Sequence, residues 1–171
     1  SSAQHHAGPF HIERPEDYDR YMLGFTYGPQ NRVPLFQLVF HDAVVCTRRW
    51  NDHYGRDMDL WRLSDLMSIV HGTPPIVKFR GDDTPHVMKE EFKTVRKLYM
   101  RTFRDVCGWH EKIGFDEMTD HRFLSEDRLV QETRFSSGHA VVVNFGLEVW
   151  DDDRGFQVSA KEFHTFVMKE E

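Results

Sequence analysis

The first candidates for a functional role are two adjacent residues, His41 and Asp42, which lie late in the apolar stretch PLFQLVFHDAVV. A carboxylate there can accept hydrogen bonds from a hydroxylated ligand, and an imidazole can donate one. We predict this stretch to be a buried strand, and ligands of α/β folds bind where such strands end. The alternative is a buried polar pair that bonds to the backbone or to itself.

A second candidate lies in the polar segment RRWNDHYGRDMD, where Trp50 precedes Asp52 by two positions. An indole presents a flat apolar face that matches the C–H face of a pyranose, and a nearby carboxylate can hold the sugar hydroxyls. In the alternative interpretation, Trp50 only covers the hydrophobic end of the fold. We expect a sugar to be bound by His41, Asp42, Trp50 and Asp52.

The elements that must position these side chains follow from the apolar pattern. The near-continuous apolar run from Leu35 to Phe40, extended by Val44 and Val45, is typical of a strand covered on both faces in a parallel sheet. LWRLSDLMSIVHG has helical spacing and a glycine stop at Gly72. IVKF is a candidate short strand. Thr84-Pro85 then opens a long amphipathic helix that runs to Gly114.

After Phe115 the pattern changes to the alternation of antiparallel strands. LVQETRF and HAVVVNFG predict a hairpin joined through SSG, and FQVS and FHTFVM are two further strand candidates. The segment DEMTDH carries several metal-capable side chains, but their spacing is that of no zinc or calcium loop, so we expect no metal there. No cofactor is expected.

Composition excludes several classes of function. Hydrophobic residues make up 39% and charged residues 29% of the 171 residues, and no apolar run is long enough to span a bilayer. The formal net charge of -6 argues against nucleic acid as a partner. The two cysteines form no zinc or disulfide pattern. No Walker, dinucleotide-glycine or Ser-His-Asp pattern is present.

PLFQLVFHDAVV, the Trp50–Asp52 turn, HGTPP, the long helix with DEMTDHRFL, and VQETRFSSGHAVVVNFG together resemble the C-terminal part of a bacterial glycoside hydrolase. The resemblance covers about residues 20 to 168. The glycosidase-like proteins that the sequence resembles are distantly similar to endo-α-N-acetylgalactosaminidases and α-galactosidase-like enzymes. It implies an α/β fold, with the last strand-helix units of a (β/α)8 barrel followed by the start of an antiparallel β-sandwich. The implied domains are 1–123, the barrel part with an N-terminal loop, and 124–171, the beginning of the sandwich. The resemblance also implies that DEMTDH is an ordinary connector between the long helix and the sandwich.

The resemblance also implies that the nucleophile and the acid/base lie on earlier barrel strands, so the chain is expected to be a fragment that lacks them. Its partners would be a carbohydrate substrate and the missing upstream barrel portion of the same protein. Glycoside hydrolysis uses two carboxylates about 5 to 5.5 Å apart for retention or roughly 6.5 to 9.5 Å for inversion. A second possibility is therefore a small complete hydrolase that uses Asp42 and Asp52.

A third possibility is a non-catalytic carbohydrate-binding or structural module. The sequence leaves the catalytic residues unassigned and does not decide between an extracellular and a cytoplasmic location in a bacterium. The start at Ser1 without a methionine supports the expectation of a processed or truncated product. A severed barrel would expose an apolar face, so we expect the chain to associate in solution.

Overall fold

The computed structural model describes residues 28–49, 58–76 and 96–168. The chain divides into two compact units, Ser1–Arg32 and Val33–Glu171. The described part of the first unit holds one short 3-10 helix, η2 (Pro29–Asn31), which begins at a proline. Most of the predicted N-terminal loop, 1–27, lies outside the described residues. All that follows concerns the second unit.

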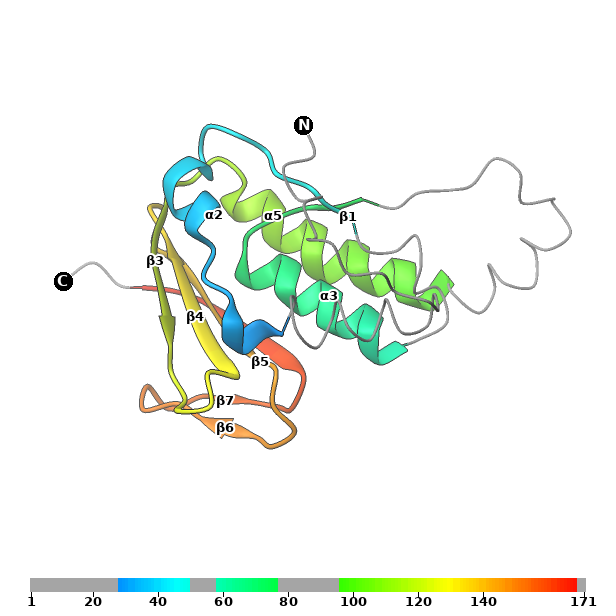
Figure 1. The fold of residues 1–171 in the computed structure, drawn as a ribbon, viewed down its shortest axis with the longest axis vertical. Helices are drawn as coiled ribbons and strands as arrows, with labels where there is room; N and C mark the ends of the chain where they lie inside the picture. Colours follow the sequence, from blue (N-terminus) through cyan, green and yellow to red (C-terminus); the bar gives the residue numbers. More distant parts are fainter. Residues whose placement is uncertain (1–27, 50–57, 77–95, 169–171) are drawn as a thin grey trace, which may run out of the picture. The chain divides into compact units, whose positions relative to one another are not determined.

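The second unit begins with helical elements and ends with strands (Figure 1). Its helices are α2 (Leu35–Phe40), α3 (Met58–Val70), the π-helical segment η3 (Phe103–Cys107) and α5 (Gly108–Ile113). Its strands are β1 (Arg48–Arg49), β2 (Pro75–Ile76), β3 (Met118–Phe123), β4 (Val130–Phe135), β5 (His139–Asn144), β6 (Trp150–Asp151), β7 (Gln157–Val158) and β8 (Glu162–Val167). Residues 96–102 are α-helical and lead directly into η3.

The sheet β3–β4–β5–β8 is antiparallel throughout. The hairpin predicted from LVQETRF and HAVVVNFG is confirmed as β4 and β5, with Gly138 at φ +83° in the turn, where glycine meets no steric penalty. The predicted strands in FQVS and FHTFVM are confirmed as β7 and β8. The expectation that DEMTDH is a connector was wrong in part, because β3 begins at Met118 and pairs with β4.

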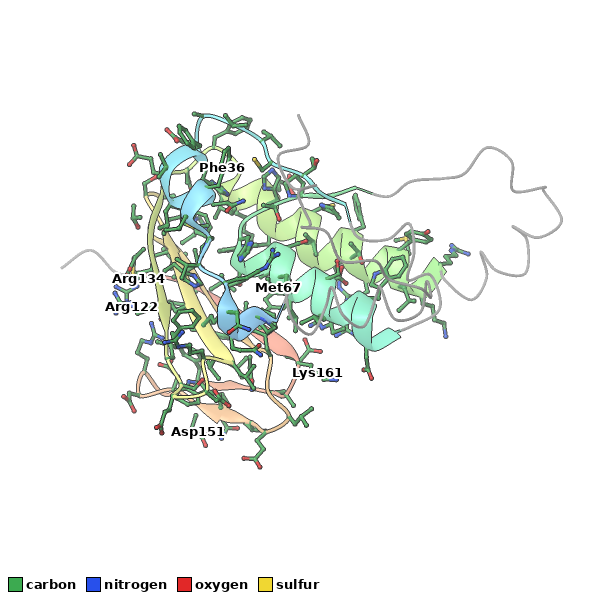
Figure 2. All side chains as sticks on the ribbon, viewed as in Figure 1. Phe36, Met67, Arg122, Arg134, Asp151 and Lys161 are labelled. Carbon is green, nitrogen blue, oxygen red and sulfur yellow. The ribbon has the colours of Figure 1, made fainter. Side chains whose placement is uncertain are left out.

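The main hydrophobic core lies between one face of this sheet and the helices. Phe135, Val141 and Val143 from the sheet pack with Met67 of α3 and Trp109 of α5. Figure 1 shows α3 and α5 on the same side of the sheet, and Figure 2 shows Met67 on α3. Since each such buried side chain contributes about 1.5 to 3 kcal/mol, this interface supplies most of the burial that holds the helices on the sheet.

The opposite face of the sheet carries a buried carboxylate held by arginines. The Glu132 side chain is 1% exposed, and its Oε1 accepts from Arg134 Nε at 2.5 Å, while Arg154 Nη2 lies 2.5 Å from Oε2. Arg154 also lies over the rings of Phe156 and Phe166. Figure 2 shows Arg134 on the side of the sheet away from α3. These contacts pin the β6–β7 hairpin across the outer face and give the sheet a partial second layer.

The predicted strand at Leu35–Val45 was wrong: its first part forms the helix α2. A short apolar run carries no period that separates a buried strand from a helix. The structure buries only one side of the run, with Leu38 packed against the main core while Leu35 and Val39 are 69% and 64% exposed. A one-sided contact suits a single helical turn, whereas the predicted strand required neighbours on both faces.

The other helix predictions agree with the described residues. The helix in LWRLSDLMSIVHG is α3, and Gly72 follows it at φ +64°, the left-handed conformation of a glycine stop. The long helix ends at Ile113, next to the predicted Gly114. Its predicted start at Thr84-Pro85 lies outside the described residues. Within it lies the π-helical segment η3, a rare helical form with i→i+5 hydrogen bonds. The spacing of the apolar residues did not predict this segment.

The strands β1 and β2 are parallel and adjacent, and α3 lies between them in the chain. This is the connectivity of a strand-helix-strand unit. β2 includes Ile76, the first residue of the strand predicted in IVKF, and the rest of that segment lies outside the described residues. Beyond this pair, the described residues show no further parallel strand of a barrel. The domain boundary at 123/124 stays a prediction; β3 and β4 pair across it, with Phe123 opposite Gln131.

No helix among the described residues is both long and apolar enough to cross a membrane.

The outer face yields a test of stability. Glu132→Gln removes a buried charge that has three arginines, Arg122, Arg134 and Arg154, at ion-pair distance, and we expect a loss of about 3 to 5 kcal/mol in the free energy of unfolding, the range for broken buried ion pairs. Denaturant unfolding measures it. Glu126→Gln, at an exposed position, is the matched control and should change the free energy by less than about 0.5 kcal/mol. Equal effects of the two substitutions would contradict the role given to Glu132.

Candidate functional site

The carboxyl ends of β1 and β2 mark the place where an α/β fold of this kind binds ligands. β1 ends at Arg49 and is followed by residues 50–57; β2 ends at Ile76 and is followed by residues 77–95. Both following segments lie outside the described residues, and with them Trp50 and Asp52. The described structure therefore fixes the strand ends from which the candidate site extends.

His41 and Asp42 occupy a different position from the one that the sequence suggested. They directly follow α2 and precede β1, so they lie on the amino side of that strand. His41 is 6% exposed, whereas Asp42 is exposed. In barrels the amino side of the strands serves stability and the carboxyl side carries chemistry. Sugar binding by the pair stays a prediction, but the strand end on which it was based is absent.

His41 makes two hydrogen bonds to backbone carbonyl oxygens. Its Nδ1 lies 2.7 Å from the oxygen of Asp116, and its Nε2 lies 3.0 Å from the oxygen of Gly72. Carbonyl oxygens only accept, so the ring makes both bonds as a donor when it carries a hydrogen on each nitrogen. The imidazole thereby joins the end of α2 to the turn after α3 and to the start of β3.

Gly72 is the centre of this junction. Its carbonyl oxygen also lies 2.9 Å from His110 Nδ1 of α5, so two histidines converge on one acceptor. Burial lowers the pKa of His110, and the bond to Gly72 partly offsets that effect. A Cβ at Gly72 would lie 2.3 Å from His41 Nε2, closer than real contacts allow. Together with the positive φ, this close approach requires glycine.

The space beside the junction is too small for a sugar. A cavity of about 10 Å³, roughly the volume that one water requires, is lined by His41, Cys46, Gly72, Thr73 and His110, among others. Thr73 is buried, and its Oγ1 has no hydrogen-bond partner among the described residues. A larger hollow of about 520 Å³ is lined by Arg96, Lys97, Met100, Arg101 and Arg104. None of the described residues that line it is a carboxylate.

A second histidine, the half-buried His121 of β3, connects the sheet to α3 through Thr133. Thr133 Oγ1 donates to the oxygen of Val70 at 2.7 Å, so it accepts from His121 Nδ1, 3.0 Å away. These two hydrogen bonds fix the neutral tautomer with hydrogen on Nδ1, and the buried Nε2 has no hydrogen-bond partner within the described part of the chain. Desolvation lowers the pKa of His121 to about 4. The ring is therefore a structural contact, and within the described residues no metal-binding group includes it.

Sequence reasoning did not identify Gly72, His110 or His121 as parts of one framework. Gly72 was recognised only as a helix stop, although HGT after an apolar helix was a usable signal of a constrained turn. His41 lies 31 positions before Gly72, and His110 lies 38 positions after it. The two histidines that meet at the Gly72 carbonyl are therefore 69 positions apart in the sequence. No local pattern records such contacts.

Comparison with known proteins identifies the class to which this chain belongs. A parallel strand pair bridged by a helix, followed by an antiparallel sheet, is an α/β unit joined to β structure. Residues 12–134 match the family described as glycosyl hydrolases related to GH101 family, GH129. The match covers more than half of the chain, which therefore belongs to this family. The resemblance to glycoside hydrolases seen in the sequence is confirmed.

Similar solved structures include alpha-N-acetylgalactosaminidase NagBb from Bifidobacterium bifidum. Its quadruple mutant is 23% identical with a TM-score of 0.46, and the match covers 77% of this chain and 18% of that one. The ligand-free form is 26% identical with a TM-score of 0.45, covering 67% and 16% of the two chains. The chain thus spans less than a fifth of the length of these structures. No curated protein matches the sequence.

The junction gives a test of the two interpretations of the His41-Asp42 pair. His41→Ala leaves the Asp116 carbonyl without this partner and opens a void at Gly72, so we expect a loss of about 2 to 4 kcal/mol in the free energy of unfolding. Asp42→Ala, at the adjacent exposed position, is the control and should cost less than about 0.5 kcal/mol. Denaturant unfolding of both variants measures these changes in the free energy of unfolding. If His41→Ala unfolds at the wild-type denaturant concentration, the junction does not support the fold.

Proposed function

We propose that the natural protein containing this chain hydrolyses O-glycosidic bonds, and that this chain supplies the last strand-helix units of its barrel and the start of its sandwich. The family match over residues 12–134 is the observation that carries the proposal. The parallel pair β1–β2, connected through α3, supports the barrel assignment because parallel neighbours with a helical crossover are the repeating unit of that fold.

The sugar-binding residues follow from the direction of β1. Trp50 comes directly after the last residue of that strand, and Asp52 lies two positions further, on the carboxyl side where barrel enzymes bind their substrates. We assign to Trp50 stacking on the apolar face of a pyranose, and to Asp52 hydrogen bonds to its hydroxyls. His41, which holds backbone on the opposite side of β1, has a supporting role.

The nucleophile and the acid/base are assigned to a part of the protein outside this chain. An exposed apolar surface supports the existence of such a part. It is formed by α2 and the segment after it: Leu35, Phe36, Val39, Phe40, Val44 and Val45, each 44% to 69% exposed. Contiguous apolar surface of this kind marks an interaction site. Phe36 of this surface is labelled on α2 in Figure 2.

The apolar surface predicts the solution behaviour of the chain. Without a covering partner, the isolated chain should increase in apparent mass with concentration, and Phe36→Lys with Val39→Glu should shift it toward the monomer without loss of folded signal. Light scattering over a concentration series, with far-UV circular dichroism as the control for folding, measures this. A monomer at every concentration in the wild type would contradict the proposed covering portion.

Activity distinguishes the proposed fragment from its alternatives. The chain alone should not cleave aryl glycosides, including the α-N-acetylgalactosaminide and the α-galactoside, whereas the natural protein that contains it should cleave at least one. In that protein, Trp50→Ala should raise KM at least about tenfold, because stacking contributes on the order of 1.4 kcal/mol. Turnover by the chain alone would instead support a small hydrolase, for which Asp52→Asn must abolish activity. Absence of activity in both would leave a binding module.

A further inference from the structure

A buried carboxylate that the proposed function does not use lies between α3 and the helix of residues 96–113. Asp65 is 3% exposed, and its carboxylate oxygens lie 2.9 and 3.0 Å from Thr102 Oγ1. Thr102 ends the α-helical turn just before η3. Trp61 of α3 donates its indole N–H to the same hydroxyl at 2.7 Å. One hydroxyl thus joins two side chains of α3 to the neighbouring helix.

The hydrogen-bond inventory leaves Asp65 incompletely satisfied as an anion. Thr102 has one hydrogen to donate, so it serves one carboxylate oxygen at a time, and its lone pairs accept from Trp61. Within the described residues, no cation lies at ion-pair distance from Asp65. A buried carboxylate with one neutral donor and no paired cation is expensive to ionise.

The nearest cations are committed to other groups. Arg62 donates from Nε to the oxygen of Lys161 at 2.9 Å, from Nη1 to Asp105 at 3.2 Å, and from Nη2 to Glu162. Arg101 bonds to Glu162 at 2.5 Å and lies 3.5 Å from Asp105. Arg62 and Arg101 thereby satisfy the carboxylates of η3 and β8, and their charges only partly stabilise an anion at Asp65.

The balance of these effects favours the protonated acid. Desolvation raises the pKa of Asp65 to about 7, the bond from Thr102 and the charges of Arg62 and Arg101 oppose the rise, and the charge of Asp105 adds to it. Asp65 in turn contributes to the raised pKa of the nearby Cys107 thiol, although burial is the larger cause there. These are the titratable and charged groups that act on Asp65 from α3 and from the facing helix.

We propose that the protonation state of Asp65 controls the packing of α3 on the helix of residues 96–113. The packing is firm when Asp65 carries its proton and weaker when the proton is lost. Asp65 lies on α3 and faces the helix of residues 96–113, and the inference does not rest on the proposed function. Titration of Asp65 would make the packing between these two helices sensitive to pH near neutrality.

The sign follows from proton linkage. The folded chain holds the Asp65 proton up to about pH 7, whereas an unfolded aspartate releases it near its model value of 3.8. Between these values the folded state binds more protons, so this contribution to stability is complete at low pH and declines as the pH rises toward 7. His121 acts in the opposite direction, because its lowered pKa removes stability as the pH falls below about 6.5.

The test compares Asp65→Asn with the wild type in denaturant unfolding from about pH 5 to about pH 8. The amide keeps the shape but cannot ionise, so the unfolding equilibrium constant of the wild type relative to the variant should rise on the order of a hundredfold across this range. The ratio cancels His121 and all other groups common to both chains. Asp59→Asn, on the exposed side of the same helix, is the control and should give a flat ratio.

A second measurement keeps the proposal testable should Asp65→Asn fail to fold. Carbon NMR of the side-chain carboxyls in the wild-type chain should show Asp65 titrating near neutrality, with amide exchange in α3 accelerating over the same pH range. An Asp65 carboxyl that titrates near 4, or a ratio for Asp65→Asn as flat as that of Asp59→Asn, would overturn the proposal.

Discussion

The hydrogen bonds at the Gly72 carbonyl are the constraint on which the arrangement of the helices depends. His41 approaches this oxygen from the end of α2 and His110 from α5, while Gly72 itself ends α3. The second nitrogen of His41 reaches Asp116, just before β3. Three helical elements and the first strand of the sheet therefore meet through one backbone turn. Only glycine permits the close approach at its centre.

The residues of this junction that stabilise the fold and the proposed sugar contacts lie on opposite sides of β1. The junction lies on the amino side of β1, and the hydrophobic core between α3, α5 and the sheet extends from it. The proposed sugar contacts, Trp50 and Asp52, follow the carboxyl side of the same strand. Such a division is expected in α/β barrels, where one end of the strands supplies stability and the loops of the other end supply function. His41 holds two backbone carbonyls at this junction, and sugar binding by His41 and Asp42 stays a prediction.

The antiparallel half of the fold was readable from the sequence because its signals are local. Alternation in VQETRF and AVVVN, with a glycine turn between them, directly specifies a hairpin whose inner residues face the helices. The helix α3 was equally clear from its spacing and its glycine stop. The family was recognisable from the order of such segments, and its model match confirmed it.

The sequence misled where an element depends on distant partners. The run from Leu35 to Phe40 has no period, so its helical state is decided by contacts of Leu38 and His41 with residues far along the chain. β3 was overlooked because it carries polar residues on a charged face, where Arg122 pairs with Asp120 and lies 3.9 Å from Glu132. The sequence did not single out Asp65, because tertiary packing determines that its carboxylate is buried with no cation at ion-pair distance among the described residues.

The central claim is that the Gly72 junction holds the helices and the sheet together, and the free energy of unfolding of Gly72→Ala tests it most directly. A methyl group at φ +64° and 2.3 Å from His41 Nε2 should cost about 3 kcal/mol or more, as strain and the displaced histidine add. Gly108→Ala, whose Cβ would meet nothing within 4 Å, provides the reference and should be neutral or slightly stabilising. Equal stability of the two variants would contradict the claim.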